Sequence, residues 1–191
     1  MAFPRMSEVR EFKTKVCLVG EMAVGKTSLI RRFVLNMFDD HYISTVGTKV
    51  SKKVVEVSLP TEERFRIEMA IWDIMGQPRM RELLGEAYFT GARAVLAVAD
   101  LTRRATFEAL GQWVESVGRV APDIPWVLAV NKSDLTWAGQ MHLHEVERFA
   151  SGYGWDYVMT SARTGENVEE SFRKLGIQIA RTRRPSALAT T

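Results

Sequence analysis

The fold of this chain is decided by the stretch Gly20-Glu21-Met22-Ala23-Val24-Gly25-Lys26-Thr27. It follows a short apolar segment at residues 15–20 and opens residues 25–37, where large apolar side chains recur at helical spacing. The pattern G-x-x-x-x-G-K-[ST] between a buried strand and a helix is typical of a loop that wraps its backbone N–H groups around phosphate. The alternative is a glycine-rich strand-to-helix turn that binds nothing.

In a phosphate loop of this kind each residue type has its own task. Lys26 would reach the outer phosphates and contribute to catalysis, and the Thr27 hydroxyl would bind Mg²⁺. The positive end of the following helix adds to the attraction for an anion. The residues expected to contact the nucleotide are Gly20, Glu21, Met22, Ala23, Val24, Gly25, Lys26, Thr27 and Ser28. The loop by itself does not identify the base.

Strand-like and helix-like segments alternate along the rest of the chain, which predicts an α/β fold. The expected strands are residues 15–20, 50–59, 65–73, 92–99, 126–130 and 155–160, and the expected helices are 25–37, 107–120, 142–149 and 167–181. A turn-like segment joins the second and third strands, so we expect six strands, mostly parallel, with one antiparallel edge strand. The last helix should bury Val168, Phe172, Leu175 and Ile179.

The composition limits the kind of protein this is. With 191 residues, 46% hydrophobic and 26% charged, the chain has the makeup of one globular domain. We expect an N-terminal extension at 1–12, the domain at 13–184 and a flexible tail at 185–191. The longest uncharged apolar run is too short to cross a bilayer, which takes ~20 residues, and a net charge of +3 is too weak to indicate nucleic-acid binding.

The single cysteine, Cys17, excludes an intrachain disulfide and a cysteine metal cluster, and its place in a strand predicts a small buried hydrophobe. His41, His142 and His144 lack metal-ligand spacing and are expected on the surface. The N-terminal residues do not form a signal peptide. These observations together predict a cytoplasmic protein.

Two segments that follow predicted strands suit the edge of a guanine base. Asp134, in Asn131-Lys132-Ser133-Asp134, can accept hydrogen bonds from the N1–H and 2-amino group of guanine, whereas adenine would leave it unpaired. After the last strand come Ser161, Ala162 and Arg163, and the backbone N–H of Ala162 is placed to donate to guanine O6. The alternatives are a solvated turn and an ordinary polar loop.

A third polar segment, Asp73-Ile74-Met75-Gly76, ends the predicted strand 65–73. Asp73 would hold Mg²⁺ through water, and Gly76 would offer its N–H to the γ-phosphate. Gln77 follows directly and would orient the attacking water. The alternatives are a strand-end aspartate in a turn and a surface glutamine.

Taken in order, these elements resemble the nucleotide-binding motifs of the Ras superfamily of small GTPases, and within it the Rab and Ras types. The resemblance covers about residues 13–181 and extends to four further segments: 42–47, 72–77, 88–92 and 100–102. It implies a three-layer P-loop GTPase fold, GTP and GDP as ligands with Mg²⁺, and a molecular switch whose surface changes on hydrolysis.

The resemblance also implies particular roles. Phe38 would stack on the guanine, although a core phenylalanine closing the first helix is the alternative. Thr45 would complete the Mg²⁺ shell in the GTP state, Asn131 would brace the base and the phosphate loop, and Lys132 would lie along the base plane. Protein effectors, an exchange factor and a GTPase-activating protein would contact residues 38–47, the hairpin and residues 77–89 of a monomeric switch.

Two departures from the family pattern bear on function. Met22, Ile74 and Met75 are larger and more apolar than usual near the γ-phosphate, from which we hypothesise slow hydrolysis. A GTP-loaded scaffold that hardly hydrolyses is the alternative function. A P-loop ATPase or nucleotide kinase is a further alternative, which residues 131–134 oppose.

The second departure concerns the termini. No cysteine lies near either end and residue 2 is not glycine, so we expect no lipid anchor and at most peripheral membrane contact. In this the chain resembles the non-prenylated archaeal and bacterial branches of the superfamily.

Overall fold

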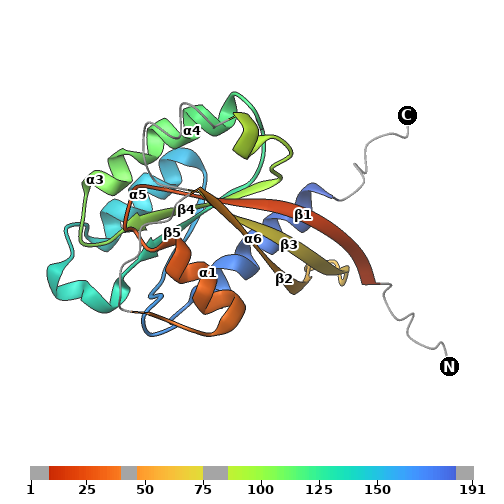
Figure 1. The fold of residues 1–191 in the computed structure, drawn as a ribbon, viewed down its shortest axis with the longest axis horizontal. Helices are drawn as coiled ribbons and strands as arrows, with labels where there is room; N and C mark the ends of the chain where they lie inside the picture. The colour runs from red at the N-terminus through yellow and green to blue at the C-terminus, as the bar shows by residue number, and fades with distance from the viewer. Residues whose placement is uncertain (1–8, 40–46, 75–85, 184–191) are drawn as a thin grey trace.

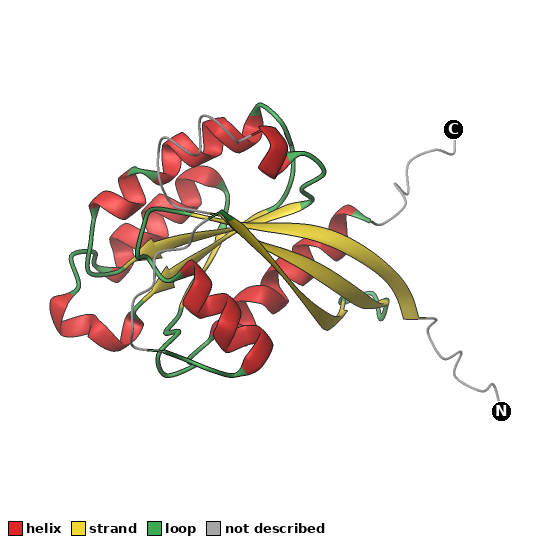
Figure 2. Cartoon of the chain, viewed as in Figure 1, coloured by secondary structure: helices red, strands yellow, loops and turns green. Residues whose placement is uncertain are grey.

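The computed structural model describes residues 9–39, 47–74 and 86–183. They form a six-stranded sheet with the order β2-β3-β1-β4-β5-β6 and helices on both faces (Figure 1, Figure 2). The expected α/β fold is confirmed. The strands are β1 (Val9–Val19), β2 (Thr48–Ser58), β3 (Arg64–Ile74), β4 (Ala94–Asp100), β5 (Trp126–Asn131) and β6 (Asp156–Met159).

Among the strands of the described residues, only β2 runs antiparallel to its neighbour, and it lies at the edge of the sheet, as the hairpin pattern predicts. β3 pairs in parallel with β1, and β1, β4, β5 and β6 continue the parallel arrangement. The carboxyl ends of these five strands therefore meet at one edge, where open α/β sheets bind their ligands.

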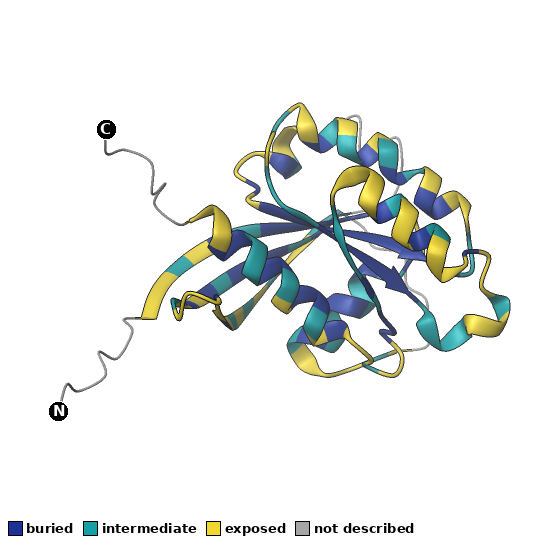
Figure 3. Ribbon diagram, turned by 180° about the vertical axis from the view of Figure 1, so that it is seen from behind, coloured by how far each residue is buried: buried dark blue, intermediate teal, exposed yellow. Residues whose placement is uncertain are grey.

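The central strand β1 begins at Val9, six residues before the expected start at residue 15. Its outer part pairs with β3 from Val9 opposite Arg64 onward, so residues 9–12 lie in the sheet. Glu11 and Lys13 are exposed there, because this end of the sheet extends beyond the helices that cover its centre (Figure 3). A strand exposed on one face lacks the continuous apolar run from which its inner half is recognisable.

The helices are α1 (Lys26–Leu35), α3 (Ala105–Glu108), α4 (Leu110–Gly118), α5 (Leu143–Tyr153) and α6 (Val168–Thr182), with a 3₁₀ segment, η1 (Ser133–Ala138). The helix expected at 107–120 starts earlier, because the Thr106 hydroxyl accepts a hydrogen bond from the Asp100 N–H and attaches the first turn to the end of β4. The helix expected at 142–149 continues to Tyr153 and ends at Gly154, whose φ of 69° suits a helix terminus.

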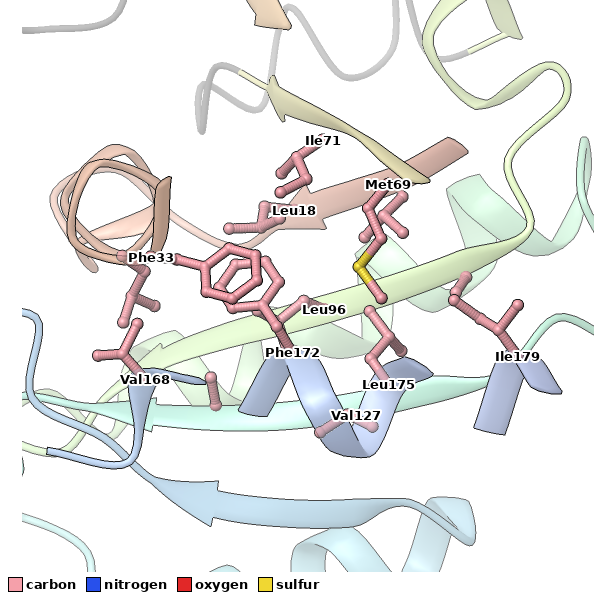
Figure 4. Packing of buried hydrophobic residues seen from close by; sticks show 14 of the residues in the cluster. Leu18, Phe33, Met69, Ile71, Leu96, Val127, Val168, Phe172, Leu175 and Ile179 are labelled. Carbon is pink, nitrogen blue, oxygen red and sulfur yellow. The ribbon is translucent and has the colours of Figure 1, made fainter. Parts of the chain in front are cut away.

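Two hydrophobic cores lie on opposite faces of the sheet. The first lies under α1 and α6 and includes all four side chains expected of the last helix, Val168, Phe172, Leu175 and Ile179 (Figure 4). Within it Phe33 of α1 stacks on Phe172, with ring centroids 3.9 Å apart. This contact ties the helix that follows the phosphate loop to the helix that ends the domain.

The second core lies under α3, α4 and α5 and contains Cys17. Cys17 is fully buried, as expected, and burial raises the pKa of its thiol to about 12, so it is an inert hydrophobe. His142 and His144 are exposed, also as expected, while His41 lies outside the described residues. None of the helices in the described part of the chain has the length and apolar character needed to cross a bilayer.

Candidate functional site

The loop between β1 and α1 follows a path that only glycine permits at two positions. Gly20 and Gly25 have φ angles of 139° and 102°, which are unfavourable for residues with a Cβ. A Cβ on Gly20 would lie 2.2 Å from the carbonyl oxygen of Val98, and one on Gly25 would lie 2.2 Å from Nδ2 of Asn131. The loop is therefore pressed against β4 on one side and against the base motif on the other.

Lys26, the first residue of α1, is directed back across this loop. Its amine donates hydrogen bonds to the carbonyl oxygens of Gly20, at 2.7 Å, and Glu21, at 2.8 Å. The side chain is only 7% exposed, and this burial lowers the pKa of Lys26 to about 8, against the opposing attraction of Asp73 and Glu21. A cation desolvated in this way gains strongly from an anionic ligand in the loop.

Thr27 and Asp73 meet beside the loop. The Thr27 hydroxyl donates to Oδ2 of Asp73 at 2.5 Å, although the two residues are 46 positions apart. Asp73 is 2% exposed, and burial raises the pKa of its carboxyl in spite of the Thr27 hydrogen bond and the nearby Lys26 charge. Its other oxygen, Oδ1, is buried without a hydrogen-bond partner among the described residues.

An unpartnered buried carboxylate oxygen beside a threonine hydroxyl is the oxygen-rich environment that Mg²⁺ prefers. The two described residues expected to hold the metal, Thr27 and Asp73, therefore fit it. The third, Thr45, lies outside the described residues, as do Gly76 and Gln77.

Asn131 joins the phosphate loop to the loop after β6. Its amide nitrogen donates to the Val24 carbonyl at 2.8 Å, and its amide oxygen accepts the backbone N–H of Ala162 at 3.0 Å. The side chain is 2% exposed. One asparagine thus sets the spacing of two segments that lie far apart in the chain.

The remaining base-motif residues are arranged around that link. Oδ1 of Asp134 accepts the Ser161 hydroxyl at 2.6 Å, which orients the carboxylate. Lys132 has a left-handed φ of 67°, and its amine donates to Oδ2 of Asp100 at 2.6 Å. The Ala162 N–H, which was expected to serve guanine O6, already donates to Asn131, so a base would have to share this donor.

Comparison with known proteins identifies the family to which a chain with this arrangement belongs. A model of the Ras family matches residues 15–181. The chain is also 35% identical over 170 residues to Ras-related protein Rab-4B of Homo sapiens, across 88% of this chain and 77% of the human protein, and it matches Rab-4B of Rattus norvegicus and Mus musculus to the same extent. The chain belongs to the Ras family. It is a Rab-like small GTPase.

In this GTPase two residues that were expected near the nucleotide pack against or within the hydrophobic cores. Phe38 is half-buried and packs against the first core, the alternative that the sequence left open for it. Ile74 is 1% exposed and belongs to the second core, so its bulk faces the protein interior. Of the residues held responsible for slow hydrolysis, Met22 is 43% exposed on the loop and Met75 lies outside the described residues.

Asp100 is a site residue of this GTPase that the motifs did not indicate. It is fully buried at the end of β4 and accepts hydrogen bonds from Thr102, Arg103 and Lys132. Burial alone would raise the pKa of Asp100, but these hydrogen bonds outweigh it and the pKa is lowered. Arg103 also donates to the Met22 carbonyl at 2.9 Å, so the carboxylate connects the phosphate loop to the base motif. The sequence signals were an aspartate ending an apolar strand and the family resemblance of residues 100–102, neither of which assigned Asp100 a role.

Arg32 is the second residue that was missed. It lies on α1, where an arginine in a helical pattern is usually solvated. Its guanidinium instead donates to the carbonyl oxygens of Ala162, at 2.9 Å, and Arg163, at 2.5 Å. The contact joins residues 130 positions apart, a separation over which sequence periodicity carries no information.

Proposed function

We propose that this GTPase is a molecular switch that binds GTP or GDP with Mg²⁺ at the edge of the sheet, hydrolyses GTP and signals through the difference between the two states. The observation that carries the proposal is the pairing of Thr27 with the buried, half-unpartnered carboxylate of Asp73 beside the desolvated amine of Lys26. A buried cation and a buried set of oxygen ligands side by side suit a metal-bound polyphosphate and little else.

The chain's own residues divide the work of binding. The backbone of the glycine loop surrounds the phosphates, and Lys26 neutralises their charge. Thr27 and Asp73 hold Mg²⁺, with Thr45 joining them in the GTP state. The bound metal neutralises the charge that develops on the phosphate oxygens. Asn131, Lys132 and Asp134, with Ser161, Ala162 and Arg163, bind the guanine, while Phe38 packs at its edge.

Hydrolysis in this proposal depends on Gln77, which orients the attacking water, and on Gly76, which contacts the γ-phosphate. We propose that the reaction is slow, because Met22 and Met75 crowd the phosphate and hinder an arginine supplied by a partner. Single-turnover hydrolysis of radiolabelled GTP tests this. A first-order rate that rises in the Met22→Gly and Met75→Ala variants supports the steric explanation, and an unchanged rate contradicts it.

A second candidate function is a scaffold that stays loaded with GTP. The exposed methionine on the phosphate loop favours it, since this side chain lies where a stimulating partner would approach. The nucleotide that copurifies with the protein separates the two functions when it is released by heat and identified by ion-exchange chromatography. GDP indicates turnover, GTP indicates the scaffold, and protein that neither carries nor binds a guanine nucleotide contradicts both.

The proposed partners are effectors, an exchange factor and a GTPase-activating protein, which would contact the hairpin of β2 and β3 and the two segments that respond to the γ-phosphate. We further propose a monomer in the cytoplasm. The nucleotide domain, expected at residues 13–184, begins in this proposal at Val9, where β1 starts. Proteins retained on immobilised GTPase loaded with a non-hydrolysable GTP analogue, but not with GDP, would identify the effectors.

A further inference from the structure

The backbone of Ala162 is held on both sides of its Cα. Its N–H donates to Oδ1 of Asn131 at 3.0 Å, and its carbonyl oxygen accepts Nε of Arg32 at 2.9 Å. Nη2 of the same guanidinium donates to the next carbonyl, that of Arg163, at 2.5 Å. Three peptide units in succession are therefore fixed by side chains from distant elements.

The planar fork of the guanidinium makes this grip directional. Nε and Nη2 point in nearly parallel directions and cannot rotate independently, so two carbonyls bound to them are fixed in orientation as well as position. A lysine at the same place would offer a single rotatable ammonium.

The loop after β6 is shaped to lie against this arginine. Gly165 has a φ of 89°, and a Cβ built on it would lie 3.5 Å from Cδ of Arg32. The Gly165 N–H donates to the Ser161 carbonyl at 2.8 Å, which closes the turn around Ala162. The turn therefore lies beside the side chain of Arg32 at a distance of ordinary van der Waals contact.

Arg32 also shares its helix with the phosphate-binding residues. Lys26 and Arg32 both belong to α1, six residues apart, which corresponds to about 9 Å along the axis at 1.5 Å per residue. A rigid helix of this length connects the phosphate end of the site to the base end without an intervening loop.

We infer that Arg32 is a positioning residue for guanine recognition: it holds the Ala162 backbone so that its N–H, which it shares with Oδ1 of Asn131, reads position 6 of the base. Arg32 also couples that reading to the helix that carries Lys26 and Thr27. The inference rests on the proposed function, because it assumes that guanine binds at this loop.

The alternative is that Arg32 only stabilises the fold. The two roles differ in what they do to the group at position 6 of the base. A stabilising residue affects every nucleotide alike, whereas a positioning residue affects the nucleotide through its oxygen O6. Replacing O6 by sulfur, a weaker acceptor, therefore separates them in a cycle of one protein change and one ligand change.

The experiment measures dissociation constants of GDP and 6-thio-GDP by displacement of a fluorescent, ribose-labelled GDP. Arg32→Met should weaken GDP binding by about tenfold, which corresponds to about 1.4 kcal/mol of misplaced hydrogen bonding. The sulfur substitution should cost the wild type about tenfold and the Arg32→Met variant no more than about twofold. Arg173→Met is the matched control, because that guanidinium makes a similar fork to Glu170 on the remote helix α6.

Arg32→Lys is the second variant, and it keeps the experiment decisive if Arg32→Met fails to fold. Because lysine offers one ammonium in place of the guanidinium fork, the loss of affinity on replacing GDP by 6-thio-GDP should be intermediate between that of the wild type and that of Arg32→Met. The inference is overturned if, in every variant, the loss of affinity from the protein change and the loss from the sulfur substitution are additive. It is also overturned if the wild type binds GDP and 6-thio-GDP equally well. If the wild type binds neither GDP nor 6-thio-GDP, the proposed function is contradicted, and the inference, which rests on it, is contradicted as well.

Discussion

The hydroxyl of Thr27, in the first turn of α1, donates a 2.5 Å hydrogen bond to the carboxylate of Asp73, at the end of β3. The contact joins the helix proposed to bind phosphate to the strand that precedes residues 75–85. Since Oδ1 of Asp73 has no hydrogen-bond partner among the described residues, this pair offers oxygen ligands to a metal ion.

Removing the Thr27 hydroxyl should uncouple nucleotide binding from magnesium. We expect Thr27→Val to lose about tenfold or more of the Mg²⁺-dependent affinity for GDP, the loss typical of a disturbed metal site. The dissociation rate of fluorescent GDP, measured with Mg²⁺ and with a chelator, checks this, and Thr27→Ser should behave as the wild type. A valine variant that still responds fully to Mg²⁺ would show that Thr27 is not a ligand.

The buried amine of Lys26 should make the nucleotide-free protein more stable as the pH rises above 8. Its pKa is about 8 in the folded state and about 10.5 when unfolded, so the unfolded chain binds more protons in this interval. Burying the charged amine lowers the free energy of unfolding by up to about 3 kcal/mol, as the pKa difference indicates. This loss of stability is fully present below pH 8 and disappears as the pH approaches 10.5.

The measurement is urea unfolding of nucleotide-free protein at several values between pH 7 and 10. The wild type should gain stability relative to Lys26→Met across that range, and the comparison cancels the contributions of other titrating groups such as Lys15. Parallel curves for the two proteins would contradict the assignment of the pKa shift to Lys26.

Replacing Asp134 should change which base is preferred. The amide of Asp134→Asn can donate to the C2 carbonyl of xanthine but leaves the 2-amino group of guanine unpaired, so we expect GDP affinity to fall by roughly a hundredfold or more and xanthosine diphosphate to be favoured. Competition binding checks this. Asp156→Asn on β6 is the control, since that carboxylate accepts a hydrogen bond from Gln178 in α6. Unchanged GDP affinity in the Asp134 variant would contradict the assignment of the base pocket to this loop.

Asp100 should contribute to stability more than an exposed ion pair. It is fully buried and receives two cationic side chains, so Asp100→Asn should lower the free energy of unfolding by about 2 kcal/mol. The exposed pair of Glu170 and Arg173 supplies the comparison, and Glu170→Gln should cost about 0.5 kcal/mol or less. Equal losses in thermal or chemical unfolding would mean that the Asp100 network is as weak as a surface pair.

The elements of the fold were predictable where the local pattern and the final environment agree. The last helix buried its expected stripe, since the period of its apolar residues needs no information from elsewhere. The outer half of β1 was not predictable, because Glu11 and Lys13 are held there only by pairing with β3 and resemble a polar extension when read alone.

The candidate site divides in the same way. The glycine loop and the segment at residues 131–134 are recognisable from the sequence, because the expected close approach of backbone to ligand requires particular residue types at particular spacings. The roles of Asp100 and Arg32 are not visible in the sequence, because the contacts that link them to the rest of the site, to Lys132 and to Arg163, lie 32 and 131 residues away. The bulk of Ile74 was misjudged near the phosphate, since only the packing of β3 shows that it faces the second core.

The sequence by itself determined the family, the parallel sheet with its antiparallel edge strand and the residue types expected to contact phosphate and guanine, because these depend on steric and hydrogen-bonding needs that act within a few residues. Only the tertiary structure decided how those residues support one another: the Ala162 N–H on Asn131, Asp100 beneath Lys132 and Arg103, and Arg32 on the Ala162 backbone. Such contacts arise when the carboxyl ends of parallel strands converge, and no local pattern encodes which side chains will then be within hydrogen-bond distance.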